Sequence, residues 1–179
     1  MARLDRANVG TVAAAAVYVV GVKLFDNVGI ICDRHFAESA IALRAMLESM
    51  RLEVDLVRVV QDRNVRDFFR DRAGSYDHTV VMTHGFGPDD DPVIGFDVVA
   101  QAAGDYNSTD GWSTARLDLG KNTAPEWIGG NGRGTLLTLS CGSGRAVLSH
   151  ALLAEGYATH IGPGTSYYAS DAGQLFAFA

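Results

Sequence analysis

Short apolar runs alternate with helix-spaced apolar residues along most of the chain. The runs at 28–32, 52–60, 79–83, 134–140 and 157–161 have the length and composition of strands. Between them, segments such as 35–50 carry apolar residues three and four positions apart, the spacing of one helix face. Strands that alternate with helices predict an α/β fold with a mainly parallel sheet between two helical layers.

Caps and glycines predict where the remaining helices begin and end. Asp62 is expected to cap a short helix that Gly74 ends, and Gly156 closes the helix after the fourth strand. Residues 170–179 are expected to form a last helix.

Two segments depart from this rhythm. Residues 1–26 form an apolar extension whose apolar stretch is too short to span a bilayer. We expect it to pack on the fold, and because Asp5 weakens its basic lead, a secretory signal is the lesser alternative. Within the domain at 27–179, residues 88–133 are predicted to be an inserted region of surface loops with a hairpin.

Composition narrows the class of protein. The 179 residues, 47% of them hydrophobic, suffice for one compact domain. With 15 Lys+Arg against 21 Asp+Glu, the formal charge of −6 supplies no basic field, so neither nucleic acid nor a membrane is an expected partner. Two cysteines are too few for a disulfide framework, which together with the lack of secretion features favours the cytoplasm.

Two reactive side chains lie at the ends of predicted strands. His84 follows the third strand and Cys141 the fourth, so if these strands are neighbours the imidazole and the thiol face one crevice. Cys141 also precedes a helix, whose N-terminal end favours a thiolate. The backbone N–H groups of Gly85, Cys141 and Gly142 could then hold an oxyanion, while His84 protonates the leaving amine. The alternative is a small buried cysteine and a histidine that caps a turn.

The other histidines are expected to be structural, namely His35, His78, His150 and His160. His35 follows the first strand and could also line the crevice.

The chain resembles the caspase-like cysteine peptidases of clan CD, which include caspases, metacaspases and the bacterial CHAT domains. The resemblance rests on VVMTHG at 80–85, LLTLSCGSG at 136–144 and GYATHIG at 156–162. It implies a caspase-like three-layer α/β/α sandwich with His84 and Cys141 as the catalytic dyad. It also implies a cysteine endopeptidase that cleaves protein substrates and needs no cofactor.

The resemblance suggests residues for the first substrate pocket as well. Residues after the first strand contribute to that pocket in the group, which makes Asp33 and Arg34 candidates. Asp33 would favour a basic side chain before the cleaved bond and Arg34 an acidic one. Ser140 stands where alanine is usual and is a further candidate. Leu139 stands where metacaspases carry an acid and caspases a glutamine, so the motif leaves the preference open.

Two loops are weaker candidates for regulation. The acidic run 89–91 is similar to calcium-binding loops of some metacaspases, but consecutive carboxylates lack the alternating ligand spacing, and no metal site is expected. Residues 105–114 could be an activation loop that the enzyme cuts.

Two alternatives to a peptidase stay open. One is a catalytically inactive caspase-like domain that binds or scaffolds a partner subunit or further domain. The other is a flavodoxin-like ligand-binding domain with the same kind of sheet. The turn at 32–35 speaks against the latter, because it has no glycine, serine or threonine to hold a phosphate.

Overall fold

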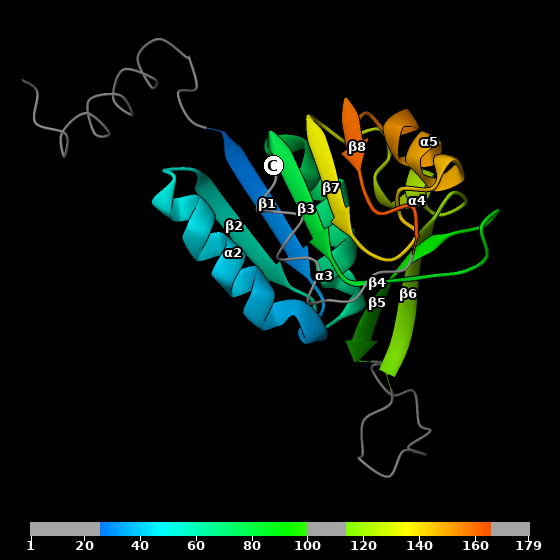
Figure 1. Cartoon of the computed structure of the whole chain (residues 1–179), viewed down its shortest axis with the longest axis horizontal. Helices are drawn as coiled ribbons and strands as arrows, with labels where there is room; N and C mark the ends of the chain where they lie inside the picture. Colours follow the sequence, from blue (N-terminus) through cyan, green and yellow to red (C-terminus); the bar gives the residue numbers. More distant parts are fainter. Residues whose placement is uncertain (1–25, 100–113, 166–179) are drawn as a thin grey trace, which may run out of the picture.

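The computed structural model describes residues 26–99 and 114–165 (Figure 1). The last helix and almost all of the predicted N-terminal extension and of the candidate activation loop lie outside the described residues. In the part that is described, no helix is long and apolar enough to cross a membrane.

A five-stranded sheet with parallel pairings forms the centre of the molecule, in the order β2-β1-β3-β7-β8 (Figure 1). Its strands are β1 (Asn27–Cys32), β2 (Glu53–Arg58), β3 (His78–Met82), β7 (Thr135–Leu139) and β8 (Thr159–Ile161). These are the strands that the apolar runs predict. The order reverses between β1 and β3, and such a reversal opens a crevice beyond the carboxyl ends of the strands.

Helices cover both faces of this sheet. They are α2 (Ala37–Ser49), α3 (Asp62–Asp67), α4 (Ala124–Trp127) and α5 (Ala146–Ala154), with the helical turns η1 (Arg34–Phe36), η2 (Phe68–Arg72) and η3 (Ala73–Ser75). Successive strand residues point to opposite faces, so Ile30 and Met82 pack with α2, whereas Ile31 and Val81 pack with α3 and α5. The fold is therefore mixed α/β and compatible with the predicted sandwich.

The described strands of the region predicted as a surface insertion contribute to the core. It contains β5 (Val93–Val99) and β6 (Thr114–Gly120), which with β4 (His84–Phe86) form an antiparallel sheet in the order β4-β5-β6. Ile94, Phe96 and Leu119 are fully buried in the same cluster as the residues under α5. The hairpin was predicted, but its placement among surface loops was wrong because its apolar side chains complete the main core.

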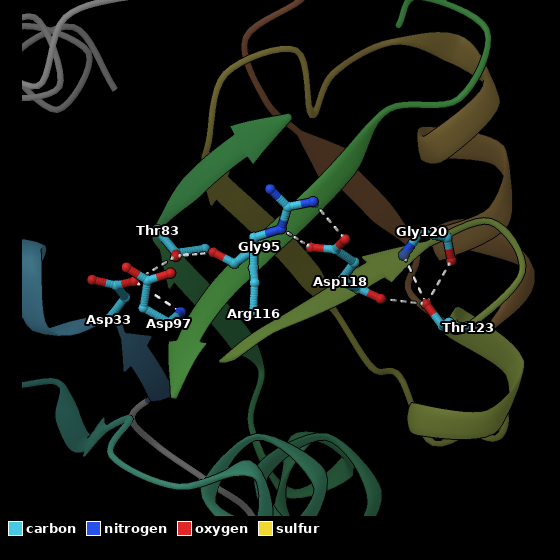
Figure 2. Close-up of polar contacts among 8 residues, drawn as sticks. All are labelled: Asp33, Thr83, Gly95, Asp97, Arg116, Asp118, Gly120 and Thr123. Carbon is cyan, nitrogen blue, oxygen red and sulfur yellow. Dashed lines mark hydrogen bonds and ion pairs between the residues drawn. The ribbon is translucent and has the colours of Figure 1, made fainter. Parts of the chain in front are cut away.

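Hydrogen bonds brace the outer strand of this hairpin (Figure 2). Arg116 donates to both carboxylate oxygens of Asp118, at 2.6 and 2.9 Å. At the end of β6 the Thr123 hydroxyl donates to the Asp118 carbonyl oxygen at 2.8 Å and accepts from the N–H of Gly120 at 2.9 Å. Arg116 thereby lies over the ring of Phe86, with its guanidinium carbon 4.3 Å from the ring centroid.

The predicted cap of the second helix was wrong by one residue. Asp62 is the first residue of α3 and Gln61 precedes it. The side chain of Asn64 accepts from the backbone N–H of Gln61 at 2.9 Å and of Val60 at 3.1 Å, which satisfies donors at the entry to the helix. Gly156 has a φ of +102°, as expected for the glycine that ends α5.

The carboxylate of Asp33 ties the end of β1 to the hairpin sheet (Figure 2). It is fully buried and accepts from the N–H of His35 at 2.7 Å and of Asp97 at 3.1 Å. The hydroxyl of Thr83 lies 3.4 Å from it and donates to the carbonyl oxygen of Gly95 at 2.5 Å. N–H donors from η1 and β5 therefore meet at this one carboxylate, which directly follows β1 and holds the hairpin against the carboxyl edge of the sheet.

Asp33→Asn is expected to lower the free energy of unfolding by about 2 kcal/mol. The new amide would present N–H groups to a backbone N–H, so one buried donor loses its acceptor. Urea unfolding of both proteins measures the change. Asp62→Asn is the control, because the Asp62 carboxylate accepts from the adjacent Arg63 N–H at the exposed surface. Equal losses in the two variants would contradict the role given to Asp33.

Candidate functional site

The ends of β3 and β7 bring Cys141 and the His84–Gly85 segment together. The two strands pair in parallel, with Met82 opposite Leu139. A β-carbon placed on Gly85 would lie 1.8 Å from the carbonyl oxygen of Cys141 and 2.6 Å from its backbone nitrogen. Only a glycine allows this approach. His84 and Cys141 therefore belong to segments in direct backbone contact, at the edge where the sequence places both.

Aromatic rings surround the imidazole of His84, which is half-buried. The ring centroid of Phe36 lies 5.1 Å away, that of His35 5.5 Å and that of Phe86 6.0 Å. The Phe36 and His35 rings meet His84 edge to face. The imidazole is thus held by His35 and Phe36, which follow β1, and by Phe86 of β4.

A carboxylate that the sequence did not indicate lies beyond His35. The Nε2 of His35 is 3.4 Å from an oxygen of Asp97, and both side chains are partly exposed. The same nitrogen is 3.3 Å from the Nε of Arg34. Asp97 comes from the middle of β5, and its place beside the histidines depends on how the hairpin packs. No spacing in the sequence could have predicted it.

The turn that carries Cys141 is separate from the helix that follows. Ser143 donates its N–H to the Ser140 carbonyl oxygen at 3.1 Å, and Gly142 has a φ of +67°. Helix α5 begins only at Ala146, after Arg145. The effect of a helix dipole falls off within its first turn. The expectation that this helix end activates Cys141 is therefore not supported by the geometry.

The loop after β8 packs against this turn and uses one of the predicted oxyanion donors. The N–H of Gly142 donates to the carbonyl oxygen of Thr165 at 3.1 Å, and that of Gly144 to Pro163 at 2.9 Å. The Arg145 side chain adds a bond to the carbonyl oxygen of Gly164 at 3.3 Å. Gly142 is thus a structural donor in this arrangement, which corrects its predicted role as an oxyanion donor.

Two of the three predicted substrate-binding side chains are buried. Asp33 serves the fold through the bonds described above. Ser140 is fully buried, and within the described residues its hydroxyl has no hydrogen-bond partner. Arg34 is exposed beside His35. Of these three predictions, Arg34 alone is carried forward as a substrate contact.

The two thiols have different surroundings. Cys141 is half-buried, whereas Cys32 is fully buried in the core under α2. Burial raises the pKa of Cys32 to about 11, so its thiol stays protonated near neutral pH.

Cations of the chain contact the acidic run. Asp89 pairs with Arg145 at 2.6 Å and Asp91 with Lys121 at 3.3 Å. Within residues 26–99 and 114–165, no group of three or more acidic, histidine or cysteine side chains could hold a metal ion.

Comparison of the chain with protein-family models, with curated proteins and with solved structures gives no match. Its function is therefore inferred from its residues and their geometry.

Iodoacetamide near neutral pH is expected to label Cys141 at least about tenfold faster than Cys32, because the alkylated species is the thiolate and Cys32 is a buried thiol. Mass spectrometry of tryptic peptides over time measures both rates. In urea, where the fold is lost, the two rates should converge. Equal labelling of the folded protein would contradict the assignment of Cys141 as the accessible thiol.

Proposed function

We propose that the protein is a caspase-like cysteine endopeptidase in which His84 and Cys141 form the catalytic dyad. The observation that carries the proposal is the backbone contact between Gly85 and Cys141. It brings the His84–Gly85 segment and Cys141 together at one edge of a parallel sheet, which supports a thiol nucleophile and an imidazole acid–base group acting there with backbone N–H donors.

The first half of the reaction forms a thioester. The Sγ of Cys141 attacks the carbonyl carbon of the peptide bond, and its proton passes to the imidazole of His84. The carbonyl electron pair moves to oxygen, where the N–H groups of Gly85 and Cys141 stabilise the charge. When this intermediate collapses, the C–N bond breaks and His84 gives the proton to the leaving amine.

The second half releases the acid product. A water molecule attacks the thioester carbon while His84 takes its proton, and the C–S bond then breaks to regenerate the thiol. All protons are moved by His84, and no cofactor takes part.

The position of Arg34 favours substrates with an acidic side chain immediately before the cleaved bond. It is exposed at the end of β1 next to His35, whose ring in turn contacts His84. Its guanidinium can bind a carboxylate with two parallel hydrogen bonds. The buried carboxylate of Asp33 is engaged by backbone donors and is poorly placed to attract a basic side chain.

A second candidate function has one observation in its favour. The strand order β2-β1-β3-β7-β8 is that of flavodoxin-like sheets, which bind phosphorylated ligands at the reversal between the first and third strands. Here that point holds the carboxylate of Asp33, which takes the N–H groups of His35 and Asp97. A carboxylate at this place repels a phosphate and already accepts from the N–H groups that would otherwise bind it. The peptidase is therefore the better-supported function.

Cys141→Ala is expected to lower hydrolysis of fluorogenic peptides at least about a thousandfold, because it removes the nucleophile. The peptides should carry Asp, Arg, Lys or Leu before the leaving group, with Asp the expected preference. Cys32→Ala is the matched control and should retain activity. Hydrolysis that survives in Cys141→Ala, or a wild type that cleaves none of the peptides, would contradict the proposal.

A further inference from the structure

A continuous chain of hydrogen bonds runs beneath the turn that carries Cys141. His160 of β8 is central to it: its Nδ1 lies 2.8 Å from the hydroxyl of Ser149 in α5, and its Nε2 lies 2.8 Å from the hydroxyl of Thr138 in β7. Thr138 donates to the hydroxyl of Ser143 at 2.8 Å, and Ser143 donates to the carbonyl oxygen of Ser140 at 2.7 Å. We call His160, Thr138 and Ser143 the relay.

The direction of every bond in the relay follows from its last acceptor. The Ser140 carbonyl oxygen can only accept, so the Ser143 hydroxyl proton points to it. Ser143 must then accept from Thr138, whose single proton is used in that bond. Thr138 can therefore only accept from Nε2–H of His160. A neutral His160 thus carries its proton on Nε2, and its Nδ1 accepts from Ser149.

The relay ends on the peptide group whose other side is Cys141. A peptide group is planar and trans, so the carbonyl of Ser140 and the N–H of Cys141 point in opposite directions. Ser143 holds that carbonyl with two donors, its N–H at 3.1 Å and its hydroxyl at 2.7 Å. Because the two groups belong to one rigid peptide group, fixing the Ser140 carbonyl also fixes the direction of the Cys141 N–H.

The relay is tightly packed, which leaves no room for a looser arrangement of its side chains. A β-carbon on Gly162 would lie 2.4 Å from the Thr138 hydroxyl and 2.7 Å from that of Ser143, so the chain packs directly on both. Thr138 and Ser143 are buried. Burial also lowers the pKa of His160 to about 4, which keeps the ring neutral near neutral pH.

The charged and titratable side chains of the elements around His160 are engaged elsewhere or exposed. At the start of α5, Arg145 pairs with Asp89. At its end, Glu155 accepts from the N–H of Gly130 at 2.8 Å. His150, also on α5, is exposed. The strand β7 and the loop 162–165 carry no charged residue.

We propose that His160 is a positioning residue for the reaction, and that through Thr138 and Ser143 it aims the N–H of Cys141 at the oxyanion. This inference rests on the proposed peptidase function. The role differs from that of a residue that only stabilises the fold, because it concerns an oxyanion that forms in hydrolysis and not in alkylation of the thiol.

Thr138→Val keeps the shape of the side chain and interrupts the relay. We expect kcat for a cleaved fluorogenic peptide to fall about tenfold or more, with KM within about twofold and iodoacetamide labelling of Cys141 unchanged. Thr138→Ser restores the hydroxyl and should restore kcat to within about threefold. Thr79→Val is the control, because Thr79 is a buried threonine of the neighbouring strand and lies opposite Leu136.

A second measurement does not depend on activity. Nitrogen-15 NMR of the wild type should show His160 with its proton on Nε2, unchanged between about pH 8 and about pH 5.5, where a histidine peptide in the same buffer changes its charge. A proton on Nδ1, or a change of charge alongside the peptide, would overturn the relay.

The outcomes separate the two proposals. A wild type that cleaves peptides, with Thr138→Val equally active, overturns the relay alone. A wild type that cleaves nothing overturns the peptidase and with it the positioning role. Equal losses of kcat and of iodoacetamide labelling in Thr138→Val would show that the turn itself is displaced and would also overturn the proposed role.

Discussion

Gly85 can lie against the backbone of Cys141 because it has no side chain, and the candidate site depends on that contact. It occurs where the chain leaves the main sheet at the end of β3 and enters β4 of the hairpin sheet. Any larger residue would push the two segments apart, because the atoms it would meet are backbone atoms. The same step that starts the hairpin therefore also brings the His84–Gly85 segment against the backbone of Cys141.

Interactions on both sides hold this contact in place. On one side, the buried carboxylate of Asp33 joins the end of β1 to the hairpin, and Phe36 packs on the imidazole of His84. On the other, the relay from His160 and the loop 162–165 hold the turn of Cys141. The imidazole and the thiol are thus positioned by different parts of the chain, which meet at the ends of β3 and β7.

The pattern of apolar residues predicted the features that depend on residues close together in the sequence. The strands at the centre of the sheet are runs of buried apolar residues, and His84 and Cys141 follow two of them, so the shared edge could be expected from spacing. The hairpin was harder to place, since Ile94 and Phe96 alternate as in any half-exposed strand and only packing shows that their side is the main core. Asp33 is predicted as a substrate contact and is instead buried, because the N–H of Asp97, 64 positions away along the chain, donates to its carboxylate.

Long-range contacts account for the other errors at the site. The N–H of Gly142 is taken by a carbonyl of the loop after β8, and no spacing indicates this bond. His160 was expected to be structural, which its half-buried place and its hydrogen bonds support, but its connection to the Ser140–Cys141 peptide needs β7, β8 and α5 in place together.

The claim that the imidazole at 84 activates the thiol at 141 can be tested without a substrate. The decisive measurement is the rate of Cys141 alkylation by iodoacetamide near neutral pH in the wild type, in His84→Ala and in His150→Ala, whose histidine is exposed on α5. We predict that His84→Ala slows alkylation at least about tenfold, while His150→Ala leaves the rate unchanged. Equal rates in all three proteins would contradict the dyad.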